Sequence, residues 1–329
     1  MAEPIASQSH EITVLRHARS AWRQQHDSAS SATDSRPSEW LSKRVALRDA
    51  PPYVALSYAW GDPSMTEPLI LDNKRINVTK NLSNALDHLE RCLDDEEALW
   101  VDALCIDQDN ELEKSNQVAH MRDVYAKATK VFAWLGPLDD SPDSDLALLW
   151  LENFGSRSDK LGIGAKGIHH LGRLLSQHQD GLTPMFRGAT GSAADTAKFV
   201  HDIQQSLDAS LNPQHGRLVL ALHGLLSRQY WSRIWTMQEV VVASKVIFAC
   251  GPRNVDSICV HHGIRLIQQF KKWQLRTKPM CKPSSEPSAT AWQTPKQGLT
   301  RLTFNALNLL KANIATGELI YILARTKPN

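Results

Sequence analysis

Four short apolar runs, separated by segments with helical periodicity, constrain the fold of this chain most strongly. They are rich in β-branched and aromatic residues and cover YVALSY (53–58), ALWVD (98–102), KVFAWL (130–135) and KVIFAC (245–250). Such runs are typical of buried strands, and helices between them supply the crossovers that parallel strands require. The sequence therefore predicts an α/β domain with a mainly parallel central sheet flanked by helices.

The segments between these runs carry signals for helices and for one hairpin. Residues 82–89 and 118–128 place apolar side chains at helical spacing. Asn110, followed three residues later by Glu113, matches a reciprocal cap at a helix N-terminus. A hairpin is expected over residues 69–78, with its turn at Asp72-Asn73.

Composition divides the chain into three parts. Residues 1–52 are polar and rich in Ser, Ala and Arg, so we expect a loosely packed N-terminal extension with one short helix. Residues 53–250 contain the four apolar runs and form the predicted main domain, in which residues 155–216 lose periodicity and predict a variable insertion with short helices. The pattern of residues 251–329 predicts a helical C-terminal segment, which a Pro/Ser-rich linker over residues 277–300 interrupts.

Charge and cysteine content exclude several classes of protein. The formal net charge of +2 argues against a protein attached mainly by its electrostatic field to nucleic acid or anionic lipid. No segment approaches the roughly 18 uncharged apolar residues of a membrane span. The five cysteines are scattered, without metal-ligand or redox spacing, as expected in a reducing compartment. We therefore expect a cytoplasmic protein with no nucleic-acid partner, no membrane span and no bound metal.

The predicted sheet indicates where a ligand would bind. Ligands of parallel sheets usually lie beyond the carboxyl ends of the strands. Ser57, Tyr58, Trp60 and Gly61 end or follow the first run, and Asp102 closes the second. Gly61 would let a ligand approach the backbone closely. Trp60 either offers a flat face to a base or nicotinamide ring or packs in the core, and Asp102 either orients a ligand or caps its loop.

Glu239 is a second kind of candidate, because its neighbours predict burial. It follows two tryptophans and precedes an apolar run in YWSRIWTMQEVVV (230–242). A desolvated carboxylate is costly and persists only if a partner or a function offsets that cost. Arg233 is a possible partner, but at a helical spacing of six it would lie on a different face.

One glycine pattern points to another class of protein. Gly162–Gly167 fits the GxGxxG pattern of dinucleotide-binding sites and would indicate a cofactor-dependent dehydrogenase. No buried strand precedes it, so the strand, turn and helix context is missing. We expect a flexible loop there. The sequence contains no phosphate-loop, HExxH or GxSxG pattern.

Three long strings together resemble the heterokaryon incompatibility (HET) domain of filamentous fungi. They run from about Tyr53 to Val246 and read YVALSYAWGD, LWVDALCIDQDNELEKSNQVAHMRDVYAKATKVFAWLGP and YWSRIWTMQEVVVASKV. The resemblance implies a role in non-self recognition and regulated cell death. The final ELIYILARTKPN looks like the approach to a further family motif, which implies an N-terminal piece of a longer protein.

HET domains are described as similar in fold to Toll/interleukin-1 receptor (TIR) domains, which implies a TIR-like fold with flavodoxin-like layering. In TIR domains that hydrolyse NAD, a Glu after a Trp is catalytic, and the matching position here is Glu239. The resemblance then implies an NAD glycohydrolase that takes NAD as substrate, needs no cofactor, and contacts the dinucleotide through Ser57, Tyr58, Trp60, Gly61 and Asp102. The alternative is a non-catalytic signalling module that associates with itself or with a recognition partner and transmits a death signal.

Overall fold

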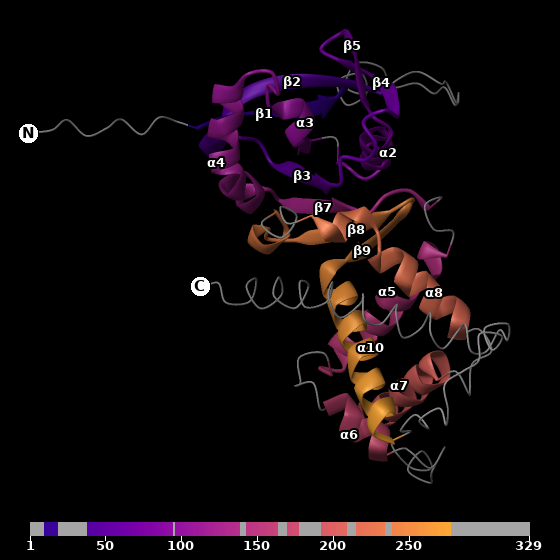
Figure 1. Cartoon of the computed structure of the whole chain (residues 1–329). Coiled ribbons are helices and arrows are strands. Elements are labelled where there is room, and N and C mark those ends of the chain that lie inside the picture. The colour runs from indigo at the N-terminus through magenta and orange to yellow at the C-terminus, as the bar shows by residue number, and fades with distance from the viewer. Residues whose placement is uncertain are drawn as a thin grey trace, which may run out of the picture. The chain divides into compact units, whose positions relative to one another are not determined.

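The computed structural model describes residues 10–18, 38–94, 96–138, 143–163, 170–177, 192–208, 215–233 and 239–277. These residues form two compact units (Figure 1). The first unit contains the described residues up to Pro137 together with Ser232–Asn254, and the second contains those from Leu138 to Trp231 and from Val255 onward. The predicted linker, the helices after it and most of the Gly162–Gly167 pattern lie outside the described residues.

The first unit is built on one nine-stranded sheet. Its strands are β1 (Glu11–His17), β2 (Glu39–Ala46), β3 (Tyr53–Tyr58), β4 (Thr66–Leu71), β5 (Lys74–Thr79), β6 (Ala98–Trp100), β7 (Lys130–Trp134), β8 (Val246–Cys250) and β9 (Arg253–Asp256). Their order across the sheet is β5-β4-β2-β1-β6-β3-β7-β8-β9. All four predicted strands and the predicted hairpin are present, so the α/β class is confirmed.

The four predicted strands form a parallel group inside the sheet. β3 pairs in parallel with β6 on one side and β7 on the other, and β7 pairs in parallel with β8. All six residues of β3 are buried. Across the sheet, the four parallel strands lie in the order β6-β3-β7-β8, so the strand that comes first in the chain, β3, lies inside the group. From β3 the chain places the next strand, β6, on one side and the following strands, β7 and β8, on the other, so the direction of winding reverses between β3 and β7. Doubly wound sheets bind ligands beyond the carboxyl ends of the strands at such a reversal.

The prediction of a mainly parallel sheet is wrong, because the complete sheet is mixed. β1 lies antiparallel to both β2 and β6, and β4 lies antiparallel to β5. The β4–β5 hairpin turns at Asp72 and Asn73, which both have positive φ, as a tight hairpin turn requires. Instead of a loosely packed extension with a short helix, the polar N-terminal part supplies β1 and β2. The strand β1 was not predicted, because polar residues flank its buried residues Ile12, Val14 and Leu15 on both sides.

In the described part of the first unit, the helices α2 (Lys80–Leu89), α3 (Asp102–Cys105) and α4 (Glu111–Lys127) accompany the sheet, and residues 239–242 are also helical. A single 3-10 turn, η1 (Leu47–Asp49), follows β2. The helix α2 contacts the β4–β5 hairpin, and α3 contacts β1. The Thr79 side chain caps α2 by accepting a hydrogen bond from the backbone N–H of Leu82 at 3.4 Å. The predicted apolar stripe of α2 is buried and consists of Leu82, Ala85, Leu86 and Leu89.

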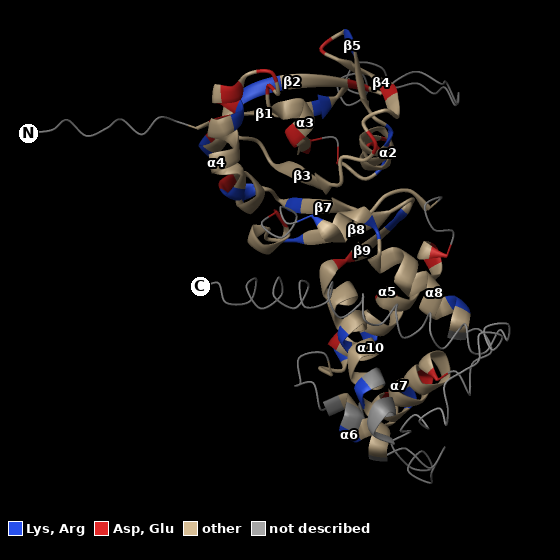
Figure 2. Cartoon of the chain, viewed as in Figure 1, with Lys and Arg blue, Asp and Glu red and all other residues tan. Residues whose placement is uncertain are grey.

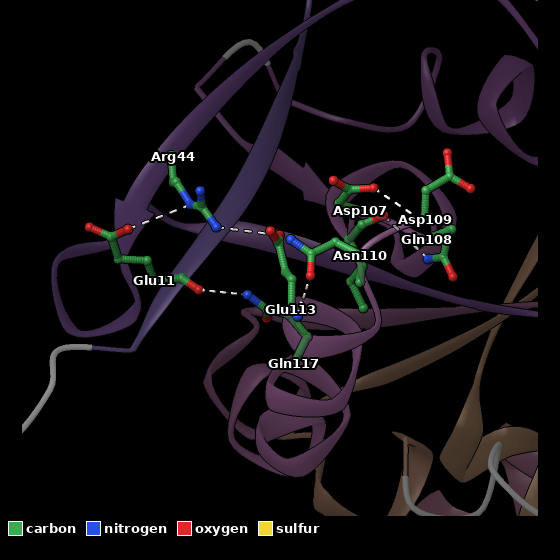
Figure 3. Close-up of polar contacts among 9 residues, drawn as sticks. Glu11, Arg44, Asp107, Gln108, Asp109, Asn110, Glu113 and Gln117 are labelled. Carbon is green, nitrogen blue, oxygen red and sulfur yellow. Dashed lines mark hydrogen bonds and ion pairs between the residues drawn. The ribbon is translucent and has the colours of Figure 1, made fainter.

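The helix α4 begins where the sequence predicts, but only half of the reciprocal cap forms. Asn110 Oδ1 accepts the backbone N–H of Glu113 at 3.1 Å, whereas the Glu113 carboxylate lies 3.3 Å from Arg44 (Figure 3). Gln117 Nε2 donates to the backbone carbonyl of Glu11 at 2.8 Å, so α4 is tied to β1 and β2. Residues of both charge signs lie along α4, in keeping with the nearly balanced composition (Figure 2).

The second unit is helical. It contains α5 (Ser144–Lys160), α6 (His170–Gln177), α7 (Ser192–Leu207), α8 (His215–Leu226) and α10 (Ser257–Thr277), and the 3-10 helix η4 (Gln229–Ser232) follows α8. The helices α5 and α10 pack at Gly155, where an added Cβ would lie 1.9 Å from the carbonyl oxygen of Cys259. Among the described helices, none has the length and apolarity needed to cross a membrane.

Candidate functional site

The loop after β3 is fixed by the side chain of Asn81. An asparagine just before the apolar stripe of residues 82–89 could cap that helix, but the N-cap of α2 is Thr79 and Asn81 bonds elsewhere. Its Nδ2 donates to the Ala59 carbonyl at 2.6 Å, and its Oδ1 accepts from Trp134 Nε1 at 3.0 Å. Gly61 adopts φ 79°, and a Cβ there would lie 2.9 Å from Asn81 Cβ. Asn81 therefore joins the carboxyl ends of β3 and β7, and only glycine fits at position 61 without strain.

Trp60 extends from this loop toward solvent. Its side chain is 47% exposed, which resolves the question that the sequence left open, since Trp60 does not pack in the core. It also hydrogen-bonds the Asp102 carboxylate. An exposed indole face next to a carboxylate suits a planar or cationic ring.

Glu239 lies at the same end of the sheet and is 3% exposed. Ser57 and Tyr125 hydrogen-bond its carboxylate, yet Oε2 has no hydrogen-bond partner among the described residues. The pKa of Glu239 is raised to about 7, chiefly by burial and also by the charge of Asp102, against the lowering effects of the Ser57 bond, the Arg233 charge and the Tyr125 bond. A buried carboxylate that titrates near neutrality, with one unsatisfied oxygen, is typical of functional sites.

Asp102 is the second carboxylate of the site. The backbone N–H of Ala103 donates to its Oδ1 at 2.7 Å; Asp102 is the first residue of α3, whose N-cap is Val101 and has no side-chain cap. Gln108 Nε2 donates to the Asp102 carbonyl at 3.0 Å and holds the following loop. Burial raises the pKa of Asp102, which the bond from Ala103, the charge of Arg233 and bonds from Tyr58 and Trp60 partly offset.

Tyr58 and Arg233 complete the group. Tyr58 is buried and hydrogen-bonds Asp102, and its pKa is raised by burial first and then by that carboxylate. An Arg233 guanidinium N–H donates to the backbone carbonyl of Tyr58. Its charge acts on both Asp102 and Glu239. Two buried carboxylates thus share the charge of one guanidinium.

The structure brings together the residues predicted separately from β3, from β6 and from the Glu239 region. The roles of Tyr125 and Asn81 were not predicted from the sequence, and a spacing of six on one continuous helix would place Arg233 on a different face from Glu239. The 3-10 helix η4 ends at Ser232, so that helical spacing does not apply. A tyrosine or asparagine within an amphipathic pattern gives no signal of its own, because its polar group acts only through tertiary contacts. In the described part of the chain, no three His, Cys, Asp or Glu side chains are grouped to hold a metal ion.

Comparison with known proteins agrees with the strings seen in the sequence. The family model "Heterokaryon incompatibility protein (HET)" matches residues 53–239, which is more than half of the chain and ends at Glu239. The chain is 29% identical over 267 residues to heterokaryon incompatibility protein 6, OR allele, of Neurospora crassa, covering 77% of this chain and 36% of that protein. It thus spans about a third of the length of this curated relative. No solved structure matches. The chain belongs to the heterokaryon incompatibility (HET) family.

Proposed function

We propose that this HET domain acts in fungal non-self recognition and regulated cell death by hydrolysing NAD at the bond between nicotinamide and ribose. The observation that carries the proposal is the buried Glu239 carboxylate, whose Oε2 has no partner among the described residues at the carboxyl end of the parallel strands. The strand order β6-β3-β7-β8 supports the likeness to TIR domains in this part of the sheet. Fold likeness alone does not carry an activity, so the argument rests on the site.

The reaction needs little from the protein beyond one carboxylate. The bond between C1′ and the pyridinium nitrogen breaks, its electron pair leaves with neutral nicotinamide, and positive charge develops on the ribose. Ionised Glu239 would stabilise that charge, and water would then add at C1′ and release a proton to give ADP-ribose. No general acid is required, because the leaving group is already cationic.

The surrounding side chains suit the same substrate. Trp60 offers an exposed aromatic face, and Asp102 with Glu239 attracts a cationic ring. Ser57 and Tyr58 would position the ribose, and Gly61 would allow the dinucleotide to approach the backbone. Because Glu239 is 3% exposed, substrate reaches it only after a local rearrangement. Assembly with a second copy or with a recognition partner would be one way to produce it.

A test in cells compares the wild type with Glu239→Gln and with Asp109→Asn, which removes an exposed carboxylate in the loop after α3. We expect the wild type and Asp109→Asn to deplete NAD and kill the host, and Glu239→Gln to do neither at equal expression. Cell death caused by Glu239→Gln with NAD intact would contradict the proposal.

One observation favours a second candidate, a non-catalytic module that self-assembles. On α4, Leu112 is 74% exposed and Val118 is 43% exposed, although the sequence predicted Val118 on the buried face. At a spacing of six, the two side chains lie on different faces of α4, so each would be a separate contact for another copy of the chain. This candidate predicts that Leu112→Lys abolishes killing while Glu239→Gln retains it.

The pH dependence of NAD hydrolysis gives a sharper prediction. Since the ionised carboxylate is required, kcat/KM should rise with pH and reach half its maximum near the pKa of Glu239, about 7. Arg233→Gln removes a charge that lowers this pKa and should move the midpoint upward, whereas Asp102→Asn should move it downward. Initial rates over a pH series measure both. Shifts in the same direction would contradict the assignment of Glu239.

A further inference from the structure

The hydroxyl group of Tyr125 has two acceptors within reach but carries one hydrogen. It donates to the backbone carbonyl oxygen of Leu56 at 3.1 Å. It also forms a hydrogen bond with the Glu239 carboxylate. A phenol has a single O–H, so it cannot donate to both acceptors at the same time. Which acceptor receives the hydrogen depends on the protonation state of Glu239.

The position of the hydroxyl oxygen is fixed, so only its hydrogen is free to turn. Tyr125 is 2% exposed, and its ring meets the buried Trp100 edge-on at a centroid distance of 5.3 Å. Two hydrogen bonds hold the end of α4 to β3 on either side of Tyr125. The Tyr53 hydroxyl donates to the carbonyl of Val124 at 2.6 Å, and the backbone N–H of Thr129 donates to the carbonyl of Tyr53 at 2.9 Å. The phenol oxygen therefore stays in place while its hydrogen rotates about the C–O bond.

Two arrangements follow from this count of hydrogens. When Glu239 is protonated, its carboxyl O–H donates to the Tyr125 oxygen, and the phenol donates to Leu56. When Glu239 is ionised, its carboxylate can only accept. A charge-assisted bond from the phenol to that carboxylate is about twice as strong as a bond to a neutral carbonyl. Because the pKa of Glu239 is about 7, both arrangements are populated near neutral pH.

We propose that Tyr125 is a positioning residue for Glu239, whose phenol hydrogen turns from the Leu56 carbonyl to the carboxylate each time Glu239 ionises. The new bond holds the carboxylate in place and favours its ionised form. In NAD hydrolysis, a role that rests on the proposed function, Tyr125 acts through Glu239. The movement of the hydrogen itself does not depend on any substrate.

Other groups act on the same carboxylate from different elements. Ser57 on β3 also hydrogen-bonds it, the charge of Arg233 favours its ionised form, and the charge of Asp102 opposes that form. Tyr58 hydrogen-bonds Asp102 and is itself affected by the charge of Glu239. The contribution of the phenol is therefore measured by removing its hydroxyl alone.

Tyr125→Phe removes this hydroxyl and keeps the ring that packs against Trp100. The experiment labels the full chain with ¹³C at the glutamate carboxyl carbons, assigns the Glu239 signal by its absence from Glu239→Gln, and follows that signal over pH by NMR. We expect the midpoint of the Glu239 titration to rise by about 0.5 to 1 pH unit in Tyr125→Phe, because the ionised form loses one hydrogen bond. An unchanged or lower midpoint would overturn the proposal.

Tyr53→Phe is the matched control for this titration. Tyr53 is 1% exposed, and its hydroxyl also donates to a backbone carbonyl near the end of α4. Both variants thus lose a buried hydrogen bond, but the Glu239 midpoint should keep its wild-type value in Tyr53→Phe. Shifts of equal size in the two variants would mean that loosening of α4 moves the midpoint, and the proposal would then be wrong.

Measurements of NAD hydrolysis separate this inference from the proposed function. In a chain that hydrolyses NAD, the pH midpoint of kcat/KM should rise in Tyr125→Phe by the same amount as the NMR midpoint. A wild type without hydrolysis contradicts the proposed function, while the NMR titration still decides where the Tyr125 hydrogen goes. A hydrolysing chain whose kcat/KM midpoint does not move in Tyr125→Phe contradicts the positioning role alone.

Discussion

Gly155→Ala is expected to destabilise the protein by about 3 kcal/mol or more, at or above the upper end of the usual cost of overpacking a core. Alanine is normally favoured over glycine inside a helix by about 1 kcal/mol, so helix propensity alone predicts the opposite sign. Here the new Cβ would lie 1.9 Å from the carbonyl oxygen of Cys259 and 2.6 Å from its carbonyl carbon. Both are backbone atoms of α10, which no rotamer change can move, so α5 and α10 would have to separate.

Urea denaturation of the wild type and Gly155→Ala measures this loss. Asn153→Ala, at an exposed position of the same helix, is the matched control and should change the free energy of unfolding by about 0.5 kcal/mol or less. A Gly155→Ala protein as stable as the wild type would show that the helices do not approach this closely.

Glu239→Gln is expected to stabilise the folded protein at pH 8 by up to about 3 kcal/mol and to leave its stability at pH 4 nearly unchanged. The folded-state pKa of Glu239, about 7, lies above the ordinary value of 4.5. Between these values the folded protein keeps a proton that the unfolded chain releases, so stability falls as pH rises. Above pH 7 the full cost of the buried charge remains, and glutamine avoids it.

Thermal unfolding at both pH values tests this expectation. Glu111→Gln serves as the control, because the Glu111 side chain is 84% exposed and its replacement should give no comparable gain at pH 8. A Glu239→Gln protein less stable than the wild type at pH 8 would contradict the burial of an uncompensated charge. Stabilisation on removal of a site residue is the usual sign that function, rather than stability, keeps it there.

Much of the parallel core could be predicted from the sequence, because β3, β6, β7 and β8 are continuous apolar runs between turn residues. The strand β1 could not, since its buried residues Ile12, Val14 and Leu15 form a short run in a polar neighbourhood. Its antiparallel place beside β6 depends on tertiary pairing that periodicity does not encode. The mixed character of the sheet follows from these N-terminal strands and from the hairpin.

The candidate site was predictable to a similar degree. The positions of Ser57, Tyr58 and Asp102 follow from the rule that ligands lie beyond the carboxyl ends of parallel strands, and the burial of Glu239 follows from its apolar neighbours. Arg233 was placed wrongly because the helical period was extended past a 3-10 helix. Which polar groups face one another across the site depends on loops, for which a sequence pattern offers no period.

The most direct measurement of the central claim is nicotinamide release from NAD by the purified chain at high protein concentration, for the wild type and for Glu239→Gln. Loss of the charge that stabilises the ribose cation should lower the rate by about a hundredfold or more, while Asp109→Asn keeps the wild-type rate. Release by the wild type and by Asp109→Asn, with little or none by Glu239→Gln, is the predicted result. Equal release by Glu239→Gln, or none from the wild type even after forced dimerisation, would contradict the assignment of Glu239 as the catalytic carboxylate.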